Sequence, residues 1–130
     1  MGVLFILSSC VPSTPPPPVI RPVDLEVDPL VQQVLEREAN AASEKPNDPE
    51  QRGRLAMAYE GNEFYERARQ AYANAETLDP HDPLWPYRRA VCRTVDEPEA
   101  GLADLRAVTE RFPRFAPAWY HLARVLVEQG

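Results

Sequence analysis

Three prolines recur along the chain at an almost constant interval. Pro46, Pro80 and Pro113 are separated by 34 and 33 residues. Because proline lacks a backbone N–H and its ring clashes with the preceding turn, each is expected to end a helix. From Asp28 onward, no stretch alternates apolar and polar residues with period two for long enough to form a strand. The spacing therefore predicts an all-α fold built from a repeated pair of helices.

The beginnings of the helices are marked by a second recurring feature, the pair Asp-Pro. An aspartate at the N-cap accepts free backbone N–H groups, and a proline at the first helical position gives up a donor that has no partner there. These pairs are Asp28-Pro29, Asp48-Pro49 and Asp82-Pro83. Together the two signals predict helices over residues 29–44, 49–60, 63–78, 83–95, 97–111 and 116–128.

The helix pair over residues 49–78 has large, small and aromatic residues at set positions. These residues are Leu55, Ala56, Tyr59, Ala68, Tyr72 and Ala75. The last predicted helix repeats the first half of the pattern with Trp119, Leu122, Ala123 and Leu126. A helix–turn–helix unit of 34 residues with this pattern resembles the tetratricopeptide repeat (TPR) family. In that family the tyrosines, Trp119 and the alanines belong to the core between stacked helices.

The resemblance implies a solenoid of about 2.5 TPR repeats over residues 46–130, the last one incomplete. Residues 28–45 are interpreted as a leading helix from a degenerate repeat. A solenoid normally ends with a helix whose outer face is polar, whereas here Leu122, Val125 and Leu126 are expected to face water. Two explanations stay open: the sequence is a fragment of a longer repeat protein, which we favour, or the open end is a docking face.

The amino-terminal residues predict export and lipidation. Residues 1–9 form a short apolar segment of the signal-peptide type, too short to span a bilayer. Leu7-Ser8-Ser9-Cys10 resembles the lipobox of bacterial lipoproteins, in which the cysteine is acylated. The proline-rich residues 10–27 are expected to be a disordered tether. The resemblance implies a chain anchored through Cys10 on the periplasmic side of a membrane, with the outer membrane favoured; the alternative is a cytoplasmic chain.

The sequence offers little for catalysis or for binding of nucleic acid. The net charge is −6, which disfavours an electrostatic contact with phosphates. No glycine-rich phosphate loop, nucleophile elbow or metal-ligand spacing occurs in the sequence. We therefore expect no enzyme, no metal, no cofactor and no small-molecule substrate.

The TPR resemblance implies instead a concave groove, lined by the first helix of each repeat, that binds a protein or peptide. The residues carried over to groove positions are Arg54, Met57, Tyr87, Arg88, Tyr120, His121 and Arg124. Arginine and tyrosine together suit a peptide with acidic and apolar side chains. The leading hypothesis is a membrane-tethered protein-binding scaffold. The alternatives are an accessory region of a larger enzyme or biogenesis factor that continues beyond residue 130, and a cytosolic TPR adaptor.

Overall fold

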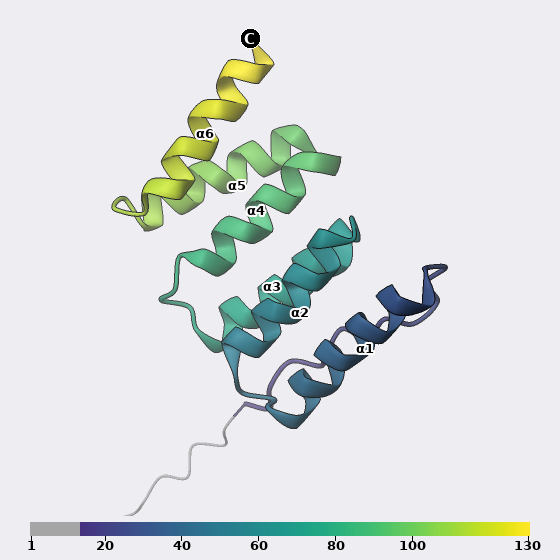
Figure 1. Ribbon diagram of the computed structural model, residues 1–130. Helices are drawn as coiled ribbons and strands as arrows, with labels where there is room; N and C mark the ends of the chain where they lie inside the picture. The colour runs from purple at the N-terminus through teal and green to yellow at the C-terminus, as the bar shows by residue number, and fades with distance from the viewer. Residues whose placement is uncertain (1–13) are drawn as a thin grey trace, which may run out of the picture.

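The computed structural model describes residues 14–130, and in this range the chain is all-helical with six helices and no strand (Figure 1). The helices are α1 (Pro29–Glu44), α2 (Pro49–Gly61), α3 (Tyr65–Leu78), α4 (Leu84–Asp96), α5 (Pro98–Arg111) and α6 (Ala116–Gln129). Each begins and ends within two residues of its predicted position. The predicted all-α repeat-like fold is thereby confirmed.

The aspartates of the Asp-Pro pairs cap the helix starts. Asp28 Oδ1 accepts the N–H of Leu30 at 2.8 Å, and Asp48 Oδ1 accepts the N–H of Glu50 at 3.0 Å. Asp82 Oδ1 accepts the N–H of Leu84 at 2.9 Å, where α4 begins. Each carboxylate thus satisfies a backbone donor that the helix itself leaves free.

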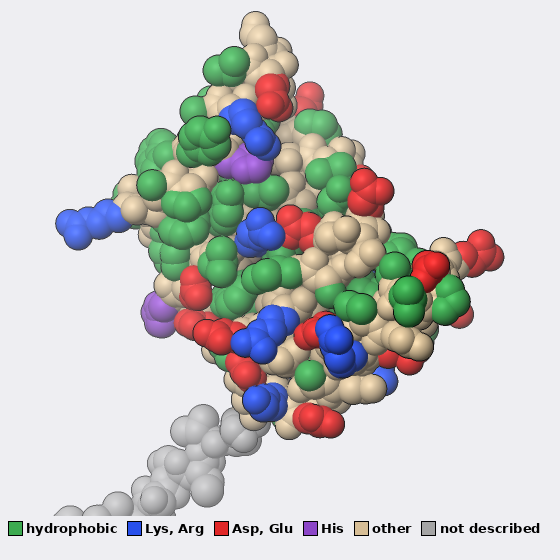
Figure 2. Space-filling model, in the orientation of Figure 1, with side chains coloured by type: hydrophobic (Ala, Val, Ile, Leu, Met, Phe, Trp, Pro, Cys, Tyr) green, Lys and Arg blue, Asp and Glu red, His purple; other side chains and the backbone are tan. Residues whose placement is uncertain are grey.

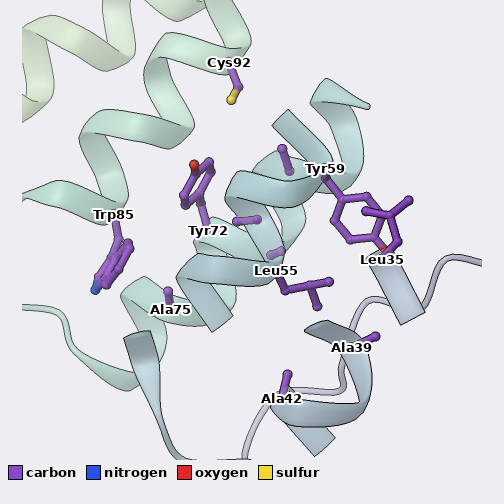
Figure 3. Packing of buried hydrophobic residues seen from close by; sticks show 12 residues of the cluster. Leu35, Ala39, Ala42, Leu55, Tyr59, Tyr72, Ala75, Trp85 and Cys92 are labelled. Carbon is purple, nitrogen blue, oxygen red and sulfur yellow. The ribbon is translucent and has the colours of Figure 1, made fainter. Parts of the chain in front are cut away.

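The helices form a stack in which each one packs chiefly against its neighbours in the sequence (Figure 1). One core cluster joins α1, α2, α3 and α4, and Figure 3 shows its side chains pointing between these helices. A second, smaller cluster joins α4, α5 and α6 through Ala90, Leu105, Leu122 and Val125. Tyr59 and Tyr72 are fully buried, as the core interpretation predicted.

Small residues allow the helices to approach closely. A Cβ atom placed on Gly53 of α2 would lie 2.2 Å from the ring of Trp85 on α4. Trp85 itself is 3 % exposed and stacks against Tyr72, with ring centroids 6.5 Å apart. The bare backbone at Gly53 therefore makes room for the indole that locks α4 onto the first helix pair.

Residues 14–27 differ from the disordered tether that was predicted over 10–27. Most of this stretch has no regular secondary structure, but it lies against the folded helices and not away from them (Figure 1). Val19, Ile20 and Leu25 pack on the first core cluster, and Pro22 is buried. The prediction is wrong for residues 14–27 because side chains far along the sequence satisfy the carbonyl groups that a free chain would present to water.

Helix α6 is also less exposed than predicted. Leu122 and Val125 are buried on the second core cluster, whereas Leu126 is 43 % exposed. Trp119, expected in the core, is 48 % exposed, and its Nε1 donates to the carbonyl of Pro113 at 3.0 Å. The packing face of α6 is thus turned toward α4 and α5, and Trp119 lies outside it.

The predicted signal segment at residues 1–9, the lipidation site Cys10 and residues 11–13 lie outside the described residues. Within residues 14–130, no helix combines the length and apolar character that crossing a bilayer requires.

Candidate partner-binding surface

The seven predicted groove residues come from three helices: Arg54 and Met57 from α2, Tyr87 and Arg88 from α4, and Tyr120, His121 and Arg124 from α6. Figure 2 shows hydrophobic side chains gathered around α6 and the beginning of α4, with single charged side chains among them. The structure joins three of the seven by direct contact and places the others in different surroundings.

The joined residues form a cluster between α4 and α6, which we call the α4–α6 cluster: Tyr87, Phe115, His121 and Arg124. The ring of Tyr87 meets the rings of Phe115 and His121 edge to face, with centroids 5.4 and 6.0 Å apart. Arg124 Nη2 lies 3.1 Å from His121 Nε2, and Tyr87 Oη lies 3.4 Å from His121 Nδ1. A guanidinium can only donate, so Nε2 accepts and a neutral His121 carries its proton on Nδ1, facing the Tyr87 oxygen.

Electrostatics favour the neutral form of His121. Burial lowers the pKa of this imidazole, and the positive charge of Arg124 lowers it further. The charge of Glu128 opposes this shift, and Arg88 adds a smaller lowering effect. The side chain of Arg124, by contrast, is 52 % exposed, and its Nε lies 3.7 Å from Oε1 of the exposed Glu128 one turn further along α6. The cluster thus presents a positive group on a fixed aromatic base.

Arg88 lies outside this cluster and contacts residues of α2 and α3. Its Nη2 lies 3.2 Å from Glu60 Oε2 on α2, and the hydroxyl of Tyr72 on α3 donates to the same oxygen at 2.5 Å. Burial and this hydrogen bond raise the pKa of Tyr72 well above its ordinary value. The three residues tie α2, α3 and α4 together, so Arg88 has a structural ion pair that the sequence pattern did not reveal.

The other predicted residues are exposed and stand apart from the cluster. Tyr120 is 72 % exposed and Met57 is 39 % exposed, and Arg54 is also exposed. They can reach a partner without rearrangement of the core.

Phe115 is the residue that sequence reasoning missed. It lies in the loop after Pro113, immediately before α6, and its ring packs edge to face against that of Tyr87. Its only signal in the sequence is an aromatic residue immediately before a helix, a position that often packs back on the helix start.

Groups suited to chemistry are few among the described residues. No group of three or more His, Cys, Asp or Glu side chains in residues 14–130 is arranged to hold a metal ion. The thiol of Cys92 is buried, and burial followed by the nearby charge of Glu60 raises its pKa to about 12. A thiol of that kind is a packing group and a poor nucleophile at neutral pH.

The sequence matches no protein-family model and no curated protein.

Proposed function

We propose that this chain is a non-catalytic scaffold of the TPR type that binds a protein or peptide partner on the surface formed by α2, α4 and α6. The observation that carries the proposal is the α4–α6 cluster, in which Tyr87 and His121 hold an exposed Arg124 in place. A rigid aromatic base beside an exposed guanidinium suits a partner with a carboxylate next to an apolar side chain. Exposed Tyr120 and Met57 supply further apolar contact area.

The preferred ligand follows from the charges of this surface. Arginine can form two parallel hydrogen bonds with a carboxylate, and the paired Glu60 leaves Arg88 less free to do so. Arg124 is therefore the residue that binds an acidic side chain, because its own ion pair with Glu128 is longer and more exposed than that of Arg88. Tyr87 and Tyr120 contact apolar groups.

The partner preference is tested by selecting peptides from a random phage-displayed library on the full chain carrying Cys10→Ala. Selected peptides should combine acidic and apolar residues, and Arg124→Glu should weaken their binding about tenfold or more. Arg37→Glu is the matched control, because Arg37 on α1 is likewise exposed and paired with a neighbouring glutamate. Equal binding by both variants would reject the surface.

The proposal also includes a membrane anchor. Leu7-Ser8-Ser9-Cys10 resembles a lipobox, so a lipid on Cys10 holds the scaffold on the periplasmic side of a bacterial membrane, with the outer membrane favoured. Mass spectrometry of the chain expressed in a bacterial host tests this part. An intact Met1 or an unmodified Cys10 would exclude it and leave the cytosolic adaptor.

A further inference from the structure

Residues 17–25, which we call the docked segment, are bound to the helices by an array of side-chain hydrogen bonds to backbone carbonyls. Arg52 Nη2 donates to the carbonyl of Pro17 at 2.8 Å, and Asn74 Nδ2 donates to that of Pro18 at 2.8 Å. The hydroxyl of Tyr59 donates to the carbonyl of Ile20, also at 2.8 Å.

The array continues along the same segment. Arg67 uses both terminal nitrogens, one on the carbonyl of Arg21 and one on that of Val23, each at 2.7 Å. Gln32 Nε2 donates to the carbonyl of Pro22 at 3.0 Å. Six carbonyls are therefore satisfied by five side chains, which we call the segment site: Gln32 of α1, Arg52 and Tyr59 of α2, and Arg67 and Asn74 of α3.

This arrangement is a mode of recognition suited to extended, proline-containing chains. A polyproline-type backbone has no internal hydrogen bonds and presents its carbonyls outward, so side-chain donors can bind it without a partner strand. Proline loses little conformational entropy on binding because its backbone is already restricted. The hydrogen bonds to the carbonyls contribute affinity, but they do not distinguish one peptide side chain from another.

Selectivity comes from the side chains of the docked segment. Ile20 packs against the first core cluster, and Pro22 is buried. Arg21 reaches in the direction of α1, where its guanidinium lies 2.9 Å from Asn40 Oδ1 and 3.4 Å from Ser43 Oγ. The site therefore recognises an apolar residue, an arginine and a proline at three successive positions of the peptide.

One member of the site opposes permanent docking. Arg52 is 1 % exposed, and within the described residues its Nε and Nη1 atoms have no hydrogen-bond partner. Its Nη2 contacts only two carbonyls, those of Pro17 and Pro46. Covering an incompletely paired guanidinium carries a desolvation penalty, and release of the segment would relieve it.

We propose that the segment site is a binding site for extended peptides of the type apolar-Arg-Pro, filled in this molecule by residues 17–25 and able to bind the same sequence as a separate peptide. The site is independent of the α4–α6 cluster and shares no residue with it. Its ligand class also differs, since it is an extended, proline-containing chain with an arginine before a proline.

The test separates the docked segment from the helices by cutting the full chain. A recognition sequence for a specific protease is inserted between Glu26 and Val27, and a fluorescent peptide of residues 14–26 is added before and after cleavage. Before cleavage the attached segment competes at an effective concentration of about 1 mM, so little peptide should bind. After cleavage, saturable binding should appear in fluorescence anisotropy.

Variants on both sides of the contact make the result specific. Arg67→Ala and Asn74→Ala should weaken peptide binding about tenfold or more, and a peptide with Arg21→Glu should bind more weakly as well. Arg106→Ala, at an exposed position on α5, should leave binding unchanged. Circular dichroism checks that each protein variant keeps its helices, and the peptide variant leaves the protein itself untouched.

Three outcomes would overturn the proposal. The first is no saturable binding after cleavage, and the second is equal binding of a scrambled peptide of the same composition. The third is loss of helical structure on cleavage that excess peptide does not restore.

Discussion

At the scale of single residues, Gly101 in the first turn of α5 lies directly against the backbone of α4. A Cβ atom at this position would lie 2.5 Å from the backbone nitrogen of Thr94 on α4. A backbone atom cannot turn aside as a flexible side chain can, so any larger residue must push the two helices apart. The absence of a side chain at Gly101 thus allows α4 and α5 to approach this closely.

Gly101→Ala should lower the free energy of unfolding by about 1–3 kcal/mol, because the added methyl group overpacks this contact. Gly61→Ala is the matched control, since nothing lies within 4 Å of a Cβ atom there. It should be neutral or stabilise by up to about 1 kcal/mol through the lost flexibility of the unfolded chain. Urea unfolding of both variants measures the difference, and similar effects of the two would contradict the packing argument.

His121 should make stability depend on pH. Its pKa in the folded chain lies below the ordinary value of 6.5, so between those two values the unfolded chain binds more protons. The free energy of unfolding therefore rises with pH across this window and falls as the solution is acidified below 6.5. His121→Gln should flatten the dependence in urea unfolding between pH 5 and pH 7.5, and an unchanged slope in this variant would contradict the assignment to His121.

At the scale of elements, α6 has one packed face and one free face. Leu122 and Val125 contact the second core cluster, while Leu126 and Val127 are 43 % and 80 % exposed. Only α5 and α4 hold this helix in the described chain, and the pairing of α5 with α6 is less extensive than that of the inner helices. The stability of α6 thus depends on few side chains.

Leu122→Ala should destabilise the fold by about 2–5 kcal/mol, since it removes a buried side chain and leaves a cavity. Leu126→Ala should change the free energy of unfolding by less than about 1 kcal/mol because much of that side chain is already in water. Denaturation curves of the two variants test this directly. Comparable losses would mean that α6 packs on a different face.

At the scale of the whole molecule, the docked segment sets the distance between the proposed lipid anchor and the helices. With residues 17–25 bound, the chain from Cys10 to Pro17 can span about 25 Å at full extension. With the segment released, the chain from Cys10 to α1 can span about 65 Å. A membrane-anchored chain would therefore have a close and a distant arrangement.

The protein is lipidated on Cys10, inserted into vesicles and labelled with a dye on an Arg37→Cys variant. Energy transfer from this dye to an acceptor lipid should report the distance between the helices and the membrane. The Arg67→Ala, Asn74→Ala double variant should lower the transfer, because the released segment lets the helices move away from the surface. The Arg106→Ala variant is the control. Unchanged transfer in the double variant would show that the segment does not limit the reach.

The sequence by itself determined the positions of the helices. The aspartates of the three Asp-Pro pairs act within two or three residues of their own position, and the prolines at 46, 80 and 113 restrict their immediate neighbours. The buried tyrosines of α2 and α3 follow from the same local period. Such interactions are readable because donor, acceptor and sequence signal lie within one turn.

The tertiary structure decided which side chains share a contact. The carbonyl of Pro18 is bound by Asn74, 56 residues away, so nothing near that proline distinguishes a docked segment from a free one. Glu60 on α2 likewise holds Arg88 of α4 in an ion pair, and the orientation of α6 buries Leu122 while it exposes Trp119. These outcomes depend on the relative placement of whole helices, which is set by packing summed over many residues and not by any local pattern.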